Sequence, residues 1–149
     1  MPGKYFEEFV VGDVIEHEVY RTVTESDNTL FSVLTMNPAR IHIDHEYAKG
    51  TEFGKPLVNS IFTLGLVVGL TVIDTTYGTT VANLGWEEVN FPLPVFVGDT
   101  IHAQTEILAV RESKSRPGQG IVTLRHRGFN QRNETVCECR RLALMLKRK

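Results

Sequence analysis

The sequence predicts an α+β domain in which one long central helix is wrapped by a curved antiparallel sheet. The first observation behind this prediction is a long apolar run over residues 61–73. The second is a series of four strand-like stretches after that run, joined by short turns that favour antiparallel neighbours. A helix that is apolar nearly all round has to be enclosed, for example by a curved sheet that wraps around it.

The size and composition of the chain fit a single domain over residues 1–149. Of the 149 residues 42% are hydrophobic, which is enough to bury a core without disulfides or metal ions. The formal net charge of −2 gives no reason to expect nucleic acid as a partner. Thr71 and Asp74 interrupt the longest apolar run, and no apolar signal core follows Met1. We therefore expect no membrane partner and a cytoplasmic location.

The N-terminal part begins with a strand and a helix. Residues 14–23 are rich in β-branched and aromatic side chains, which predicts a strand. Thr24 and Asp27 resemble the two ends of a capping box, with Asp in place of the usual Glu, and predict a helix over residues 24–36. Pro38 stops this helix because its ring removes a backbone donor.

A loop and a second short helix are expected next. Residues 37–43 carry no periodic pattern and are expected to form a loop. Asp44 then suits the cap of a helix over residues 45–49, which Gly50 closes.

The long helix and the sheet complete the domain. The helix is expected to begin near Asn59 and Ser60 and to end near Thr75. Four stretches of alternating polarity after it predict strands over residues 81–91, 100–111, 121–130 and 135–146. Cys137 and Cys139 lie two apart in the last of these, so we expect two reduced cysteines packed in the sheet, and no metal site.

Three motifs occur in a fixed order in the middle of the chain. They are TMNPARIHID at residues 35–44, FGKPLVNS at residues 53–60 and FPLPVFVGDT at residues 91–100. Together they resemble the MaoC-like dehydratase and (R)-specific enoyl-CoA hydratase family. Residues 5–7, 83–86 and 111–117 further resemble the subgroup that includes mesaconyl-CoA hydratase. The resemblance implies a hot-dog fold, a homodimer or higher homo-oligomer with the substrate tunnel between two subunits, and an acyl thioester of coenzyme A as substrate.

The resemblance also implies which groups act on that substrate. In the family an Asp and a His, five residues apart, contact the water that adds across the enoyl thioester; His42 matches the His, and Asn37 stands at the Asp position. His42 is expected to act as acid or base, because imidazole titrates near neutrality. Asn37 cannot take up that proton, but its amide can orient a water molecule. The Ser60 N–H, at the beginning of the long helix, is expected to stabilise the enolate oxygen.

Several charged residues are candidates for binding the substrate. Arg40 lies two residues before His42, and its planar guanidinium suits a second carboxylate on a short, dicarboxylic acyl chain. Asp44 is a further candidate in the same motif. The phosphates of coenzyme A are expected to meet Arg111, Lys114 and Arg116. No cofactor is expected apart from the coenzyme A of the substrate, because hydration transfers no electrons.

Each candidate also has a purely structural explanation. His42 can bond to a neighbouring carbonyl, Asn37 can form a turn, and Ser60 can cap a helix. Asp44 suits a helix cap and Arg40 suits solvent, while the basic residues near 111–116 suit a solvated hairpin. The remaining histidines belong to no motif and are expected at the surface or in strands: His17, His45, His102 and His126.

Two other functions remain open at this point. Hot-dog domains also host thioesterases, which usually place a carboxylate on or near the central helix, where this sequence offers only Asp74 near the far end. A non-catalytic acyl-CoA-binding protein is the alternative from another class, and Asn37 at the Asp position is the best argument for it.

Overall fold

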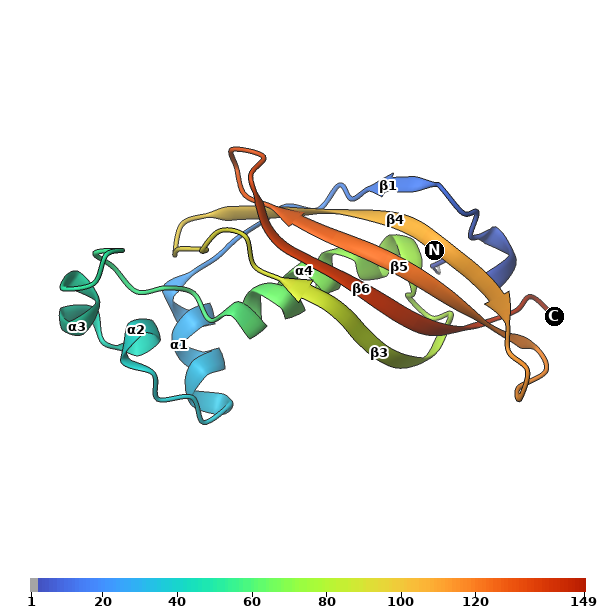
Figure 1. Cartoon of the computed structure of the whole chain (residues 1–149), viewed down its shortest axis with the longest axis horizontal. Coiled ribbons are helices and arrows are strands. Elements are labelled where there is room, and N and C mark those ends of the chain that lie inside the picture. Colours follow the sequence, from blue (N-terminus) through green and yellow to red (C-terminus); the bar gives the residue numbers. More distant parts are fainter. Residues whose placement is uncertain (1–2) are drawn as a thin grey trace.

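The computed structural model describes residues 3–149 and contains one curved antiparallel sheet. The strands run in the order β1-β4-β5-β6-β3, and β2 also pairs with β4. Their bounds are β1 Val14–Glu16, β2 Arg21–Thr22, β3 Thr80–Asn90, β4 Thr100–Glu112, β5 Gln119–Phe129 and β6 Thr135–Leu146. The four long strands confirm the stretches expected from alternating polarity. The sheet curves around the long helix α4, Ser60–Thr75, as expected (Figure 1).

One face of α4 packs closely against the sheet. A Cβ atom at Gly128 of β5 would lie 2.3 Å from Cγ2 of Val67, so the glycine lets this turn of the helix pack directly on the strand. Val67 is completely buried there. The buried positions of the helix are Thr63, Val67, Leu70, Thr71 and Thr75.

The opposite face of α4 is not enclosed within one chain. Ile61 is 57% exposed and Ile73 is 61% exposed, and Gly65 and Gly69 between them are exposed as well. The curved sheet therefore covers one face of the helix and leaves this stripe uncovered within one chain. Its exposure leaves apolar surface that a second subunit is able to cover.

Three short helices stand together at one end of the sheet (Figure 1). They are α1 Glu25–Leu34, α2 Arg40–Ile43 and α3 His45–Lys49. The predicted capping box is confirmed, because the Asp27 N–H donates to the Thr24 hydroxyl at 3.2 Å and the Thr24 N–H donates to the Asp27 carboxylate at 2.7 Å. The predicted cap of α3 is confirmed too, with the Tyr47 N–H donating to the Asp44 carboxylate at 2.9 Å.

Two local expectations are wrong. The loop expected over residues 37–43 contains α2, a single turn that is too short to leave a periodic pattern in the sequence. The strand expected over residues 14–23 is interrupted between β1 and β2, and His17 in this gap is only 3% exposed. His17 was expected at the surface or in a strand; it lies buried in the segment between β1 and β2 and hydrogen-bonds to the exposed Asp74 carboxylate and the buried Thr105 hydroxyl.

The two cysteines and the apolar character of the helices were also the subject of expectations from the sequence. Cys137 and Cys139 are free and buried in β6, as expected, and burial raises the pKa of Cys137 to about 12. Within residues 3–149, no helix has both the length and the apolar character needed to cross a membrane.

Candidate active site

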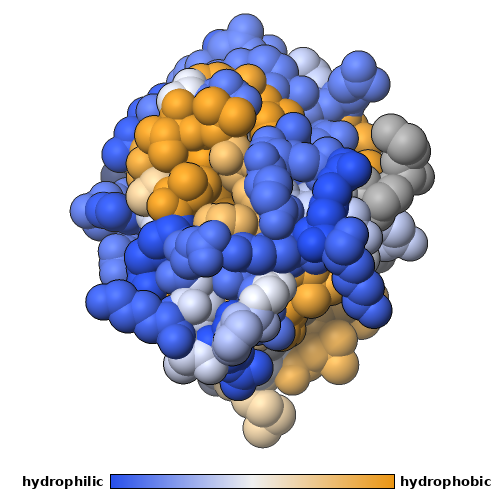
Figure 2. Space-filling model, turned by 90° about the vertical axis from the view of Figure 1, so that its right-hand side faces the viewer, coloured by the Kyte–Doolittle hydropathy of each residue, from blue (hydrophilic) through white to orange (hydrophobic). Residues whose placement is uncertain are grey.

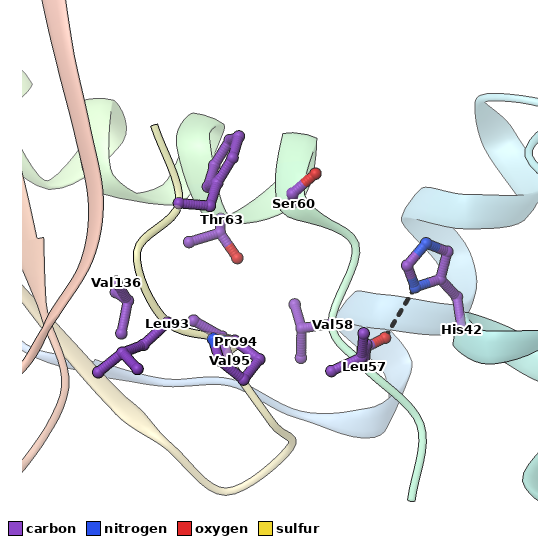
Figure 3. Close-up of a pocket in the computed structure, with 10 residues that line it drawn as sticks. His42, Leu57, Val58, Ser60, Thr63, Leu93, Pro94, Val95 and Val136 are labelled. Carbon is purple, nitrogen blue, oxygen red and sulfur yellow. Dashed lines mark hydrogen bonds between the residues drawn. The ribbon is translucent and has the colours of Figure 1, made fainter. Parts of the chain in front are cut away.

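The three sequence motifs meet at one cavity of about 290 Å³. His42 comes from α2, Ser60 and Thr63 come from the first turns of α4, and the segment between β3 and β4 supplies Leu93 and Pro94. Figure 3 shows Leu93 and Pro94 across the cavity from His42, with Ser60 and Thr63 along its edge. The cavity thus combines an apolar wall with a few polar groups, as small-molecule sites commonly do.

A backbone carbonyl fixes the tautomer of His42. The Nδ1 atom of His42 lies 2.9 Å from the carbonyl oxygen of Leu57, the contact drawn as a dashed line in Figure 3. A carbonyl oxygen only accepts hydrogen bonds, so Nδ1 carries the hydrogen. In the neutral imidazole, Nε2 is then the unprotonated nitrogen and is able to accept a proton.

The beginning of α4 places backbone donors beside the same cavity. Asn59 is the N-cap, and its side-chain oxygen accepts from the Ile61 N–H at 3.1 Å. The cap therefore satisfies Ile61 rather than Ser60, and Ser60 stands in the first helical position, where an N–H has no intrahelical acceptor. The positive end of the helix dipole lies at the same place, which suits a developing oxyanion.

A second cavity of about 210 Å³ lies on the other side of His42, which lines both. It contains charged groups from three segments: Glu25 of α1, His45 of α3 and Lys55 of the following loop. His45 pairs with Glu25 at 3.1 Å, whereas the Lys55 ammonium stands 4.4 Å above the ring of Phe96. The loop position of Lys55 gave no reason to single it out in the sequence.

Asn37 lines neither of the two cavities that His42 lines. Its side-chain oxygen accepts a hydrogen bond from the Ala39 N–H at 3.1 Å, which is the turn geometry common for Asn. It lines a separate depression of about 240 Å³ with apolar neighbours that include Met36 and Pro38. A role for Asn37 in orienting water therefore stays a prediction from the resemblance.

Arg40 and Asp44 bond to each other and line neither cavity beside His42. The Arg40 Nε–H donates to the Asp44 carboxylate at 2.8 Å, and the guanidinium lies 4.6 Å from the centre of the Tyr47 ring. The hydrogen bond from the Tyr47 N–H, followed by that from Arg40, lowers the pKa of Asp44. Both residues thus have local structural partners.

Arg111, Lys114 and Arg116 lie at the other end of the molecule. Arg111 belongs to the last part of β4, and Lys114 and Arg116 belong to the turn before β5, at the end of the sheet opposite α1, α2 and α3 (Figure 1). Viewed from that end, a hydrophilic band crosses the surface between two apolar areas (Figure 2). These three residues do not join the His42 cavity within one subunit, so a phosphate contact there stays a prediction.

The structure also brings together polar residues that belong to no predicted site. Asn28 of α1 lines the second cavity, and its buried side chain reaches both motif segments around His42. Such contacts join residues 14 and 29 positions apart, and no spacing rule in the sequence reveals them. Across the described part of the chain, no group of three His, Cys, Asp or Glu residues is arranged to hold a metal ion.

Two known proteins of similar sequence are named for reactions on coenzyme A thioesters. A mesaconyl-CoA hydratase of Cereibacter sphaeroides is 33% identical over 146 residues, which cover 98% of this chain and 42% of that protein. A β-methylmalyl-CoA dehydratase of Chloroflexus aurantiacus is 30% identical over 147 residues, covering 99% of this chain and 41% of that protein. The chain therefore spans about two fifths of the length of these two relatives.

Solved structures of other proteins have a fold similar to that of this chain. A protein described as a monoamine oxidase regulatory protein from Archaeoglobus fulgidus has a TM-score of 0.87 and 33% identity, covering 100% of this chain and 98% of that chain. A Mycobacterium tuberculosis protein described as a double hot-dog fold has a TM-score of 0.86 and 22% identity, covering 98% of this chain and 45% of that chain. The family model of the MaoC like domain matches residues 8–128. This chain, with its sheet wrapped around α4, is therefore a hot-dog-fold member of the MaoC-like family.

Proposed function

We propose that this chain is a hydratase or dehydratase that adds water to, or removes it from, a short enoyl thioester of coenzyme A. The observation that carries the proposal is the fixed tautomer of His42, with Nδ1 bonded to the Leu57 carbonyl at 2.9 Å and Nε2 left as a base. The names of the two relatives that cover nearly the whole chain support the same reaction class.

The proposed reaction needs one base and one oxyanion donor. His42 Nε2 takes a proton from water as the water oxygen bonds to Cβ, and the C=C electron pair moves toward the thioester oxygen. The Ser60 N–H stabilises the negative charge on that oxygen. The resulting enolate is then protonated at Cα by the His42 imidazolium, which restores the neutral base. No electrons are transferred overall, so coenzyme A enters as part of the substrate and no redox cofactor is required.

We propose that the substrate is a dicarboxylic enoyl-CoA. Mesaconyl-CoA and β-methylmalyl-CoA, named for the two relatives, each carry a carboxylate beyond the thioester, and Lys55 supplies a cation in the second cavity beside His42. A cation near the reacting carbons suits such a group, because charge-assisted hydrogen bonds are stronger than neutral ones.

We also propose that the chain works as a homodimer or a larger homo-oligomer. One stripe of α4 is exposed and apolar, and Leu34 and Met36 at the end of α1 are 80% and 87% exposed. Among residues 3–149, the strand β3 forms one edge of the sheet and pairs only with β6. A second copy is the natural occupant of these surfaces, because the double hot-dog relative contains about twice the length of this chain.

The test is to mix the purified protein with crotonyl-CoA, mesaconyl-CoA and butyryl-CoA, following enoyl absorbance and the release of free thiol. A hydratase consumes enoyl absorbance without releasing thiol, a thioesterase releases thiol, and a binding protein does neither. His42→Ala is expected to lower turnover roughly a hundredfold or more. His42→Gln is the matched variant, because its amide is able to donate to the Leu57 carbonyl but cannot take up the proton. Normal turnover in both variants would contradict the role of His42.

A further inference from the structure

One buried amide connects the three segments that build the His42 site. Asn28 lies in α1 and is 2% exposed. Its Nδ2 donates to the carbonyl of His42 at 3.1 Å and to the carbonyl of Leu57 at 2.9 Å. Its Oδ1 accepts from the backbone N–H of Asn59 at 2.9 Å. The two donor hydrogens and the acceptor of this amide are therefore all used, by partners in α2, in the segment before α4 and at the cap of α4.

The Leu57 carbonyl has a double role in this arrangement. It accepts from Asn28 and also from Nδ1 of His42, each at 2.9 Å. The side chain of His42 is thus oriented by an oxygen atom that Asn28 holds in place. Asn28 also donates to the backbone carbonyl of His42, so it contacts the backbone of this residue directly and its ring through the Leu57 carbonyl.

We infer that Asn28 is a positioning residue, which sets the tautomer of His42 and the place of its Nε2 relative to the Ser60 N–H. The inference rests on the proposed function, because His42 and Ser60 are its proposed base and oxyanion donor. Asn28 fixes the peptide N–H directly before Ser60, through Asn59, and the acceptor of His42, through Leu57. A displacement of about 1 Å between such groups costs up to about a hundredfold in rate.

The informative substitution is Asn28→Asp. The variant keeps the size of the side chain and the oxygen that accepts from Asn59, but places a second oxygen against the carbonyls of His42 and Leu57. The segment itself stays tethered, because the Leu57 N–H also donates to the Ile41 carbonyl at 3.0 Å. Asn28→Ser is a second variant, whose shorter hydroxyl has one hydrogen and cannot donate to both carbonyls, and it adds no charge.

The matched control is Ser32→Ala, one helical turn further along α1. Ser32 is fully buried, and its hydroxyl accepts from the Asn59 side-chain amide at 3.3 Å. The control thus loses a buried hydrogen bond from the same helix but bonds neither to His42 nor to Leu57. We expect it to lose stability and to keep the kinetic constants of the parent within about twofold, since it leaves the Asn28 contacts intact.

The first readout is the tautomer of His42, which nitrogen NMR of the imidazole ring measures without any substrate. The His42 signals are identified by their loss in His42→Gln. We expect the neutral ring to carry its hydrogen on Nδ1 in the parent and in Ser32→Ala, and to become a mixture of tautomers in the two Asn28 variants. A parent ring protonated on Nε2, or unchanged signals in both Asn28 variants, would overturn the inference.

The second readout is the kinetics of enoyl-CoA hydration. We expect kcat of folded Asn28→Asp and Asn28→Ser to fall about ten- to hundredfold, with KM close to that of the parent, because only the placement of the base changes. An unchanged kcat in both variants would overturn the inference. A parent that hydrates no enoyl-CoA would contradict the proposed function instead, and the tautomer measurement then still decides whether Asn28 orients His42.

Discussion

Nδ1 of His17 lies 2.6 Å from a carboxylate oxygen of Asp74, so the segment after β1 is bonded to the last turn of α4. The other ring nitrogen of His17 lies 2.8 Å from the Thr105 hydroxyl, which lies 2.8 Å from Nδ1 of His126. A carboxylate oxygen accepts hydrogen bonds, so Nδ1 of His17 carries a hydrogen, and in the neutral ring Nε2 accepts from the Thr105 hydroxyl. Thr105 in turn accepts from His126. Three of the four side chains in this series of hydrogen bonds are buried: His17, Thr105 and His126.

Replacing His17 with Ala is expected to destabilise the fold by about 1–3 kcal/mol, because the Thr105 hydroxyl then loses its acceptor inside the core. Urea unfolding of the parent and the variant measures the difference. The control is His45→Ala, whose exposed pair with Glu25 is worth about 0–1 kcal/mol. An equal loss of unfolding free energy in the two variants would show that the buried hydrogen bonds of His17 contribute no more than a surface ion pair.

His126 makes the stability depend on pH. Burial, and then the charge of Arg141, lower its pKa to about 3, so the folded protein does not protonate His126 in mild acid. The unfolded chain takes up this proton near pH 6.5, hence acid favours unfolding and the contribution is lost as pH falls from there toward about 3. We expect the parent to lose about 1.4 kcal/mol more per pH unit in this range than His126→Gln. Parallel curves for the two proteins would contradict this.

The sequence was informative where a pattern is local or belongs to a motif. Alternating polarity located the four long strands, and the cap residues located the starts of α1 and α3. The motifs located His42 and Ser60, which share a cavity. The sequence did not reveal that His17 leaves its strand, since the partners of its ring are 57 and 88 residues away. Hydrogen bonds across such separations are set by tertiary packing, for which a single sequence carries no spacing signal.

The same limit explains why Arg40 attracted attention and Lys55 did not. Arg40 lies two residues before His42, but α2 is a helical turn rather than an extended loop, and the guanidinium reaches Asp44 on the surface. Lys55 is 13 positions after His42 in the sequence, and the chain returns it to the cavity that His42 lines. The cation nearest to His42 in the sequence is therefore Arg40, whereas the cation that shares a cavity with His42 is Lys55.

Dimerisation is expected to depend on the free edge at β3. Leu84 is 49% exposed on this strand, and a Lys there would place like charges of two copies near each other. We expect sedimentation to show a dimer of the 16.8 kDa parent and a dissociation constant at least about tenfold higher for Leu84→Lys, which is about 1.4 kcal/mol. The control is Val14→Lys on β1, at the opposite edge of the sheet and 54% exposed. Dissociation by Val14→Lys alone would place the interface at the other edge.

The last prediction concerns the second carboxylate of the proposed substrate, and it compares two cations. Lys55→Met removes the ammonium from the cavity beside His42 and keeps most of the length of the side chain. We expect it to lower the ratio of kcat/KM for mesaconyl-CoA to kcat/KM for crotonyl-CoA by about ten- to hundredfold, because a charge-assisted hydrogen bond contributes about 1.5–3 kcal/mol. Arg40→Met is expected to leave that ratio within about twofold, because Arg40 is 65% exposed and already pairs with Asp44. A fall of the ratio in Arg40→Met alone would assign the carboxylate to Arg40. A parent that prefers crotonyl-CoA would contradict a dicarboxylic substrate and leave the hydration chemistry of His42 in place.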